Sequence, residues 1–319
     1  MSSIGFGTWA WGNKFLWGYS PEKQDLILEE TFKEAIKSGL NFIDTADSYG
    51  TGKLAGRSEL LLGKFIKELP KAKMQNLIIA TKLAPYPWRI GRNGFLKALN
   101  DSSNRLQGKI DRVQLHWSTY NYAPWQELQL IDGLGDLVKN GVIPELGVSN
   151  MGAKRLRTIH NRLKNRDVTL KSLQIQFSLL SPESNSFYEI KNVCEELNIE
   201  IISYSPLALG VLTIPPGTIK KANTFIRQQI YLRLLDSSEE LRQGLQKIAA
   251  YRNVSQAQVA LNWCRAHGTK PIVGIRTPKQ AKEAAAATKW NLNKKEVQEL
   301  TSLKNECNRR MPKNPFQSI

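Results

Sequence analysis

The chain has 319 residues, of which 41% are hydrophobic and 23% are charged, a composition typical of a folded globular protein. Its formal net charge of +17 raises the question of nucleic-acid binding, but the basic residues are spread along the whole chain. No RNP-type, zinc-finger or helix-turn-helix pattern accompanies them. We therefore interpret the charge as a generally basic surface without a nucleic-acid partner, one that would attract an anionic small molecule.

The three cysteines, Cys194, Cys264 and Cys307, are far apart and form neither a CxxC motif nor a metal-binding pattern with histidine. We expect free thiols in a reducing compartment and no metal site. No apolar run reaches the length of a transmembrane helix, and the first residues lack the basic-then-apolar order of a secretory signal. A soluble, cytoplasmic protein is expected; the oligomeric state is left open.

Short apolar runs rich in β-branched residues recur along the chain, and each is followed by a segment with helical periodicity. Most of these runs begin roughly 30 residues apart, which is the length of one βα unit. The predicted strands are Ile4–Thr8, Asn41–Thr45, Leu77–Lys82, Arg112–His116, Glu145–Val148, Ser172–Phe177, Glu200–Tyr204 and Pro271–Ile275.

The helices between these strands have recognisable ends. The first is predicted to begin at Ser20–Pro21, where serine can cap the helix and proline can open it. Leu28, Phe32 and Ile36 form its apolar stripe, and Gly39 ends it.

Eight such alternations, without a break in composition, predict a single (β/α)8 TIM barrel over residues 1–319, with segment 214–235 as an inserted loop. An open doubly wound sheet would require a glycine-rich turn after its first strand. The nearest candidate, Gly133-Leu134-Gly135, lies within a helical stretch and follows no strand. We therefore reject it as a dinucleotide-binding motif.

Active sites of such barrels lie at the C-terminal ends of the strands, and four polar residues occur there. Asp44, Lys82 and His116 each end a predicted strand, and Tyr49 follows in the loop after Asp44. Taken singly, each has an ordinary structural explanation. Asp44 could be a turn residue, and Lys82 could extend to solvent. His116 could be a hydrogen-bonded structural histidine, and Tyr49 could pack in its loop. Because three successive strands each bring an ionisable group to one rim, we interpret the four as a catalytic group.

These four residue types suit the reduction of a carbonyl group. Hydride transfer to a carbonyl leaves an alkoxide, which requires a proton from a positioned acid. Tyr49 is predicted to be that acid, with the Lys82 ammonium lowering its pKa from the ordinary value of about 10. Asp44 would keep Lys82 charged, and His116 would donate a hydrogen bond that orients the substrate oxygen.

At these residues the sequence resembles the aldo-keto reductase family, and the resemblance extends over essentially the whole chain. Its segments occur in family order. They are Gly7-Thr-Trp9, Phe42-Ile-Asp-Thr-Ala-Asp-Ser-Tyr-Gly50, Ala80-Thr-Lys82, Leu115-His-Trp117, Gly147-Val-Ser-Asn150, Ile202-Ser-Tyr-Ser-Pro-Leu207 and Ile272-Val-Gly-Ile-Arg-Thr277.

The resemblance implies an enzyme that uses NADP(H) at the C-terminal rim of a barrel. Asp44, Tyr49, Lys82 and His116 correspond to the family's catalytic tetrad. The cofactor-binding positions that it implies are Gly7, Thr8, Trp9, Asp44, Ser149, Asn150, Gln174, Tyr204, Ser205, Pro206, Leu207, Gly210, Arg276, Thr277, Gln280 and Glu283. Thr277 would cap a helix opened by Pro278, and its N-terminus together with Arg276 suits the phosphate of NADP(H).

Three features depart from the family pattern. A Gly-Lys pair often follows the Ser-Pro-Leu loop in the family, whereas Ile214 and Pro215 stand here. Asparagine usually ends the adenosine motif, whereas this chain has Ala284. The chain also begins almost at the first strand, without the usual β-hairpin. From the first two departures we expect cofactor affinity to be weaker or differently distributed, and from the third we expect a cost in stability more than in chemistry.

Within the family, the resemblance is strongest to members that reduce pyridoxal. Three tryptophans, Trp11, Trp88 and Trp117, follow strand ends and are predicted to line a pocket for a small aromatic aldehyde, with pyridoxal the favoured substrate. Packing beneath a loop is the alternative for each of them. The alternative function is a nucleotide-sensing, NADP-binding protein with little turnover, but all four tetrad positions are filled, which favours the enzyme.

Overall fold

The computed structural model describes residues 3–182, 185–218 and 221–318. Eight strands form a closed barrel in chain order, as predicted, and the pairs β1–β8, β3–β4, β4–β5 and β5–β6 run parallel. The strands are β1 (Gly5–Gly7), β2 (Phe42–Asp44), β3 (Ile78–Leu83), β4 (Arg112–Leu115), β5 (Glu145–Ser149), β6 (Leu170–Gln176), β7 (Glu200–Tyr204) and β8 (Lys270–Gly274).

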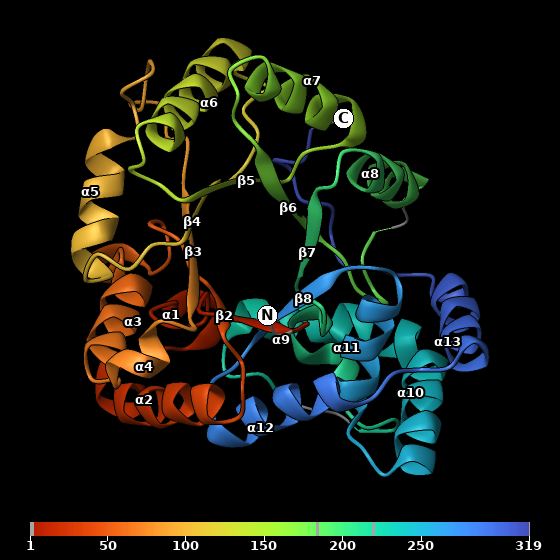
Figure 1. Cartoon of the computed structure of the whole chain (residues 1–319). Helices are drawn as coiled ribbons and strands as arrows, with labels where there is room; N and C mark the ends of the chain where they lie inside the picture. Colours follow the sequence, from red (N-terminus) through yellow and green to blue (C-terminus); the bar gives the residue numbers. More distant parts are fainter. Residues whose placement is uncertain (1–2, 183–184, 219–220, 319) are drawn as a thin grey trace. The chain divides into compact units, whose positions relative to one another are not determined.

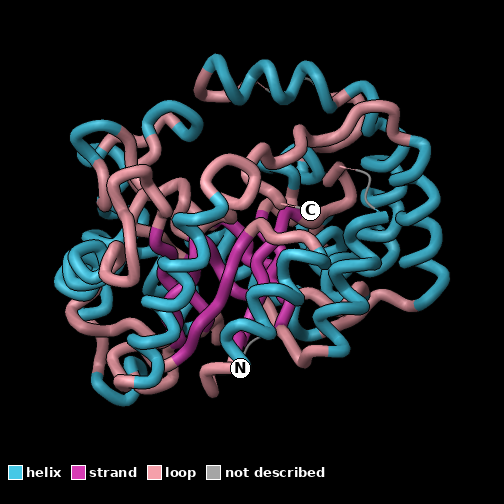
Figure 2. Tube along the Cα trace, turned by 90° about the horizontal axis from the view of Figure 1, so that it is seen from above, coloured by secondary structure: helices cyan, strands magenta, loops and turns pink. Residues whose placement is uncertain are grey.

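Helices occupy most of the chain between the strands (Figure 1), and Figure 2 shows how short the strands are beside them. The α-helices are α1 (Lys14–Trp17), α2 (Pro21–Lys37), α3 (Arg57–Lys67), α4 (Lys71–Met74), α5 (Leu96–Arg105), α6 (Pro124–Lys139), α7 (Ala153–Lys164), α8 (Asn185–Glu196), α9 (Phe225–Leu234), α10 (Glu239–Arg252), α11 (Gln256–Ala266), α12 (Pro278–Ala286) and α13 (Lys294–Glu306). Four 3-10 helices join them: η1 (Gly52–Leu54), η2 (Ala208–Thr213), η3 (Asp236–Ser238) and η4 (Ala287–Lys289).

Every predicted strand overlaps an observed one, because the apolar β-branched runs that predict them are the buried segments of the chain. Helix α2 begins at Pro21 and buries Leu28 and Phe32, as predicted. Two details differ. The hydroxyl of Ser20 donates to the carboxylate of Glu22 at 2.5 Å instead of capping the helix, and Ala35 is buried where Ile36 was expected to be.

The segment 214–235 is not simply a loop, and the prediction was wrong for its second half. Residues Phe225–Leu234 form helix α9, which Thr224 caps by accepting a hydrogen bond from the backbone N–H of Arg227. Helix α9 packs against α1, and the hydroxyl of Thr224 donates to the carbonyl of Leu16 at 2.9 Å. Contacts with a distant segment, which periodicity does not reveal, stabilise this helix.

The chain forms two compact units, which we call the first unit (residues 1–42, 176–183 and 203–313) and the second unit (residues 43–175, 184–202 and 314–319). In the first unit, α2 packs against α12, and α10 packs against α11 and α13. In the second unit, α3 packs against α5, and α7 packs against both α6 and α8. No helix among residues 3–182, 185–218 and 221–318 is long and apolar enough to cross a membrane.

The two glycines of the rejected motif lie in helix α6, as predicted, and have different surroundings. A methyl group at Gly133 would overlap the carbonyl oxygen of Arg92, so the backbone of the loop between β3 and α5 approaches the helix closely there. A methyl group at Gly135 would meet the Cδ2 atom of Leu163 at 3.4 Å, an ordinary contact. Gly133 therefore serves packing, whereas Gly135 has room for a side chain.

We predict opposite effects of alanine at these two positions. Gly133→Ala should lower the free energy of unfolding by about 1–3 kcal/mol, because the backbone of Arg92 must move. Gly135→Ala should leave it unchanged or raise it by up to about 1 kcal/mol, because alanine favours the helix. Urea unfolding followed by circular dichroism measures both, and equal effects of the two substitutions would contradict the packing role of Gly133.

Candidate active site

The second unit brings the four predicted catalytic side chains together. The Lys82 ammonium donates to Asp44 Oδ2 at 2.7 Å and to the Tyr49 hydroxyl at 3.0 Å. It also donates to the backbone carbonyl of Thr45 at 2.7 Å. The ring of His116 lies edge-on to that of Tyr49, with centroids 5.6 Å apart. Lys82 and Asp44 are buried, whereas Tyr49 and His116 are partly accessible.

Strand register explains why Lys82 points into the barrel. Lys82 on β3 pairs with Gln114 on β4, which pairs with Gly147 on β5, which in turn pairs with Ser172 on β6. A side chain at Gly147 would lie 2.5 Å from Ser172 Oγ and 2.9 Å from Gln114 Cγ, so this layer is filled and requires glycine.

Two glutamines hold the carboxylate of Asp44. Gln174 donates to its Oδ1 at 2.7 Å, and Gln114 donates to the same oxygen at a longer 3.4 Å. Gln174 was predicted at the site, whereas Gln114 was missed. The signal was present, because Gln114 stands two residues before His116 and side chains two apart on a strand share a face.

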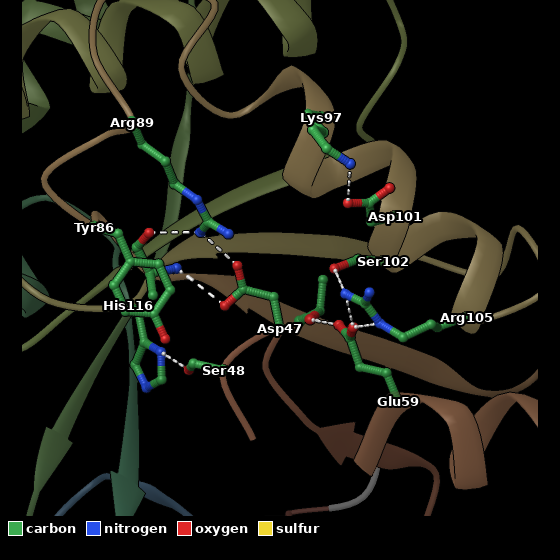
Figure 3. A network of polar contacts seen from close by, with 12 residues as sticks. Asp47, Ser48, Glu59, Tyr86, Arg89, Lys97, Asp101, Ser102, Arg105 and His116 are labelled. Carbon is green, nitrogen blue, oxygen red and sulfur yellow. Dashed lines mark hydrogen bonds and ion pairs between the residues drawn. The ribbon is translucent and has the colours of Figure 1, made fainter. Parts of the chain in front are cut away.

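A second layer of ionic contacts fixes strand β3 from outside the barrel (Figure 3). The hydroxyl of Thr81, next to Lys82, donates to Glu59 at 2.5 Å, and Arg105 donates to the same carboxylate at 2.7 Å. Glu59 is completely buried, and its burial raises the pKa of this carboxyl group more than Arg105 lowers it. A fixed Thr81 in turn fixes the backbone that carries Lys82.

The loop that carries Tyr49 is tied to the loop after β3. Asp47 accepts a hydrogen bond from the backbone N–H of Ala84 at 3.2 Å and an ion pair from Arg89 at 2.5 Å (Figure 3). The same Arg89 nitrogen donates to the carbonyl of Ala84 at 2.6 Å. Because Asp47, Ala84 and Arg89 each contact the other two, the loop before Tyr49 has little freedom to move.

Glu127 holds the loop after His116 in a similar way. This buried carboxylate accepts hydrogen bonds from the Ser118 hydroxyl at 2.5 Å and the Thr119 backbone N–H at 2.8 Å. Arg155 pairs with its other oxygen at 2.6 Å. The loop that follows β4 is thereby anchored to α6 and α7.

The direction of one pKa shift corrects a prediction. Burial raises the pKa of Tyr49 above its ordinary value of 10.0, and the Lys82 ammonium lowers it by less, so the net shift is upward. Burial lowers the pKa of Lys82, but Asp44 and Tyr49 together raise it by more. Tyr49 thus keeps its proton at neutral pH, and the Lys82 charge is available to stabilise the phenolate once the proton has left.

His116 is neutral at physiological pH. Burial, helped by the Lys82 charge, holds the pKa of its imidazole well below the ordinary 6.5. Its Nδ1 atom lies 3.0 Å from the hydroxyl of Ser48 (Figure 3). A neutral imidazole has one donor nitrogen and one acceptor nitrogen, so His116 can donate a hydrogen bond to a substrate oxygen without carrying charge.

Asn150 and Ser149, predicted to hold the cofactor, lie at the end of β5 in the second unit. The Asn150 amide donates to the His116 carbonyl at 3.1 Å and to the Ser149 hydroxyl at 3.1 Å. The C-terminal segment also contacts this residue: Asn314 donates to Asn150 Oδ1 at 2.9 Å, and the backbone N–H of Ser318 donates to its carbonyl at 3.2 Å. The sequence pattern did not single out this segment.

The three predicted substrate-binding tryptophans do not all belong to the same unit. Trp11 belongs to the first unit, where it is fully buried against Phe6 and donates to the carbonyl of Ile275 at 2.9 Å. Trp11 is therefore part of the buried core of the first unit. Its position just past a strand end does not reveal this burial. The indole turns inward, where its N–H group finds a hydrogen-bond acceptor.

Trp88 and Trp117 belong to the second unit and join an aromatic cluster, which we define as Tyr86, Trp88, Trp117 and Phe316. Tyr86 stacks on Trp88 with ring centroids 4.7 Å apart and meets Trp117 edge-on at 6.0 Å. Trp117 stacks on Phe316 at 5.0 Å and lies 5.0 Å from the His116 ring. Trp88 is 73% exposed and Phe316 is 42% exposed, so the cluster offers open apolar surface beside His116.

The remaining predicted cofactor residues belong to the first unit. Gly7 ends β1, Thr8 is buried, Trp9 is exposed and Tyr204 ends β7. Ser205 and Gly210 adopt positive φ angles of 53° and 97° on either side of Pro206 and Leu207. Thr277 caps helix α12 as predicted, Gln280 accepts from the backbone N–H of Arg276 at 2.8 Å, and Glu283 lies on the same helix.

Arg227, which the sequence pattern did not single out, lies beside Arg276. Both guanidinium groups approach the ring of Trp17, at 4.3 Å and 4.9 Å from its centroid. Arg227 also donates to the carbonyl of Leu209 at 3.0 Å. Burial lowers the pKa of both guanidinium groups, and the Arg227 charge lowers that of Arg276 further. No carboxylate of residues 3–182, 185–218 or 221–318 forms an ion pair with either arginine.

The departures from the family pattern have structural counterparts in the first unit. Ile214, which stands near the usual Gly-Lys position, is buried, and Arg242 donates to its carbonyl at 3.0 Å. Ala284 is buried on helix α12. Among the residues that the structure describes, no group of three histidine, cysteine, aspartate or glutamate side chains gathers in a way that could hold a metal ion.

Comparisons with known proteins agree with this geometry. The model of the aldo/keto reductase family matches residues 3–305. A chloroplastic pyridoxal reductase of Arabidopsis thaliana is 45% identical, in an alignment that covers 100% of this chain and 87% of the relative. A versiconal hemiacetal acetate reductase of Aspergillus parasiticus is 28% identical over 89% of this chain and 90% of the relative.

Among solved structures, an aldo-keto reductase of Klebsiella pneumoniae in complex with NADPH superposes with a TM-score of 0.72 at 22% identity. The superposition covers 99% of this chain and 95% of that protein. At this identity the likeness concerns the fold, and it agrees with the closed barrel of eight strands.

Proposed function

We propose, from the premise that the chain belongs to the aldo/keto reductase family, that it reduces a small aromatic aldehyde to the alcohol with NADPH. The observation that carries the proposal is the line of hydrogen bonds from Asp44 through Lys82 to Tyr49 beside the neutral His116. Oxidation of NADPH by the purified protein, followed at several aldehydes including pyridoxal, tests it. Tight binding of NADPH without turnover would instead favour a nucleotide sensor.

In this proposal each of the four side chains has one task. The Tyr49 phenol gives its proton to the carbonyl oxygen of the aldehyde, and the His116 N–H holds that oxygen in place. The Lys82 ammonium, 3.0 Å from the phenol oxygen, stabilises the phenolate that forms. Asp44 keeps Lys82 charged inside the protein and is itself held by Gln174.

The residues present fit NADPH. When bound, NADPH supplies the hydride. Ser149, Asn150 and Gln174 would hold its nicotinamide carboxamide, and Tyr204 would stack on the nicotinamide ring. The loop from Ser205 to Gly210 would face the pyrophosphate, where a side chain at Gly210 would lie only 3.1 Å from Arg227.

The adenosine end has the chemistry of a phosphate site. Arg276 and Arg227 have no carboxylate partner among the described residues, and both lie against Trp17. Burial lowers the pKa of the Arg276 guanidinium, and repulsion by the Arg227 charge lowers it further. A dianionic 2′-phosphate would relieve that repulsion, and Thr277 opens helix α12 beside them. Arg227 would thereby take over part of the task of the lysine that this chain lacks.

The substrate would lie against the aromatic cluster. Flat rings bind well to stacked and edge-on aromatic side chains, which add about 0.5–1.5 kcal/mol beyond burial. Trp117 and Phe316 lie next to His116, where the carbonyl group would be held. Pyridoxal meets these requirements, and the plant relative is named for its reduction.

Two further expectations stay proposals. We take residues 1–319 as one barrel domain, with segment 214–235 inserted between β7 and β8. We also keep the cytoplasmic location expected from the sequence, although the Arabidopsis relative is chloroplastic. Fractionation of the source cells with an antibody against the protein would decide the location.

The first functional prediction concerns the proton donor. Tyr49→Phe should lower kcat about 10²-fold or more, because the phenylalanine has no proton to give, while NADPH affinity stays unchanged. For the unaltered protein, kcat for reduction should be level between about pH 7 and 9. Tyr49 titrates above 10.0 and His116 below 6.5 in this structure, so neither changes charge in that range. Turnover near the original level in the phenylalanine variant would remove Tyr49 from its role.

The second concerns cofactor choice. Arg276→Ala and Arg227→Ala should each weaken NADPH binding by about 10-fold or more, the range of a charge-assisted hydrogen bond, and hardly affect NADH. Fluorescence titration of the cofactor measures both affinities. Arg233→Ala is the matched control, since Arg233 lies exposed on the same helix α9. Equal weakening of NADPH and NADH would show that the altered arginine does not contact the 2′-phosphate.

The third concerns the substrate. Trp117→Ala and Phe316→Ala should lower kcat/KM for pyridoxal by about 3- to 10-fold more than for an aliphatic aldehyde of similar size, because only the ring loses its aromatic contacts. Trp125→Ala is the control, because this tryptophan is 67% exposed and lies outside the aromatic cluster. A preference of the unaltered protein for aliphatic aldehydes would contradict the aromatic pocket.

A further inference from the structure

Ser48 occupies a position in the site to which neither the sequence pattern nor the proposed chemistry gives a task. Its hydroxyl lies 3.0 Å from the Nδ1 atom of His116, and its chain neighbour is Tyr49 (Figure 3). The other ring nitrogen of His116, Nε2, has no hydrogen-bond partner among residues 3–182, 185–218 and 221–318. The protein therefore holds one edge of the imidazole ring and leaves the other edge for a ligand.

Which nitrogen of a neutral imidazole carries the hydrogen depends on what each nitrogen meets. If Nδ1 carried the hydrogen, Nε2 would direct a lone pair at the carbonyl oxygen of the substrate, and the two lone pairs would repel each other. If Nδ1 accepts a hydrogen bond, Nε2 carries the hydrogen and can donate it. The partner of Nδ1 thus decides whether His116 can hold the substrate oxygen.

The contacts around Ser48 fix its place. Asp47, the preceding residue, is bound by Arg89 and by the backbone of Ala84. Tyr86 is a neighbour of Ser48 (Figure 3), and burial raises the pKa of its phenol above the ordinary 10.0, against a smaller lowering by the Ser48 hydroxyl, so Tyr86 keeps its proton. The face of the same Tyr86 ring lies under the guanidinium of Arg89, 4.9 Å from the ring centroid. The serine hydroxyl is therefore placed between a phenol on one side and an imidazole on the other.

The relative donor strengths of the three groups favour one direction for the hydrogen bonds between them. A phenol is a stronger donor than an aliphatic hydroxyl, so Tyr86 can donate to the Ser48 oxygen while the Ser48 hydrogen turns to the lone pair of His116 Nδ1. Each of the two hydroxyl groups then donates one hydrogen bond along the series, which is the arrangement in which neighbouring bonds strengthen one another. Tyr86 also stacks on Trp88, so this series begins at the aromatic cluster.

We propose that Ser48 is a positioning residue that donates a hydrogen bond to His116 Nδ1 and so keeps the ring hydrogen on Nε2, directed at the substrate carbonyl oxygen. The proposal rests on the proposed function for the identity of the group that His116 meets. It adds a residue that acts through His116 and does not itself touch the substrate.

The ring nitrogens of His116 can be observed directly. The chain has 3 histidines, so a long-range proton–nitrogen correlation spectrum of the protein labelled with ¹⁵N-histidine contains few signals. His160→Gln and His267→Gln assign the other two rings, and the remaining signals belong to His116. We expect Nε2 to be protonated and Nδ1 to be unprotonated and shifted by a hydrogen bond. A protonated Nδ1 in the unaltered protein would overturn the proposal without any variant of Ser48.

A pair of variants with the same shape isolates the hydroxyl group. Ser48→Thr keeps it and Ser48→Val replaces it with a methyl group, so crowding affects both equally. In the threonine variant the Nδ1 signal should keep its place. In the valine variant it should move to the position of an unprotonated nitrogen without a donor, or merge with the Nε2 signal as the tautomers mix. Identical spectra of the two variants would contradict the role of the hydroxyl.

Kinetics provide the functional half of the test. We expect kcat for reduction to fall about 5- to 10-fold in Ser48→Val, the effect of one lost hydrogen bond, and to change less than about two-fold in Ser48→Thr. The affinity for NADPH should stay the same in both, and equal kcat values in the two variants would count against Ser48. Absence of turnover in the unaltered protein would instead contradict the proposed function, while the spectrum would still report on the tautomer.

Discussion

The site depends on one buried ion pair, that of Lys82 with Asp44. Removing two charges from water costs several kcal/mol for each ion, and the attraction between them offsets this only when their remaining hydrogen-bonding capacity is satisfied. The structure meets that condition on both sides. Lys82 has a carboxylate, a backbone carbonyl and a phenol as its three acceptors, and Asp44 receives donors from two glutamines. Tyr49 therefore has two tasks: it accepts a hydrogen bond from the Lys82 ammonium, and it is the proposed proton donor. Its position serves the stability of the ion pair as well as catalysis.

Much of this could be predicted from the sequence, for definite reasons. Buried parallel strands are runs of apolar β-branched residues, and a polar residue at the end of such a run, like Asp44 or Lys82, stands out against them. The upward pKa shift of Tyr49 could not be predicted in the same way. Charges can be counted along a sequence, whereas the loss of water around a phenol depends on the packing of several distant segments. Helix α9 shows the same limit, because its support comes from α1, about two hundred residues earlier in the chain.

Trp11, Phe316 and Arg227 show where position along the chain stops being informative. Trp11 follows a strand end and still turns into the core, because a carbonyl of the last barrel segment accepts its indole hydrogen. Phe316 and Arg227 lie in segments without a motif. Their proposed roles become visible only from their contacts in the fold, those of Phe316 with Trp117 and of Arg227 with Trp17. Gln114 is different, because it is the strand partner of Lys82, and its place two residues before His116 in the sequence was enough to predict it at the site. Local periodicity thus identifies residues on the strands, while long-range contacts decide the role of residues in the loops.

The hydrogen bond between Asn314 and Asn150 has a consequence for the synthesis of the protein. The two residues are 164 positions apart, and Ser318 contacts the same asparagine through its backbone. During translation, β3, β4 and β5 leave the ribosome long before residue 314 does, and segments fold in the order in which they emerge. Until the late segment arrives, Asn150 has its hydrogen bonds to His116 and Ser149 but lacks those from Asn314 and Ser318. A chain released early would thus carry Asp44, Lys82 and His116 but lack the two hydrogen bonds that the C-terminal segment makes with Asn150, so an incomplete product would differ from the finished protein at the site itself.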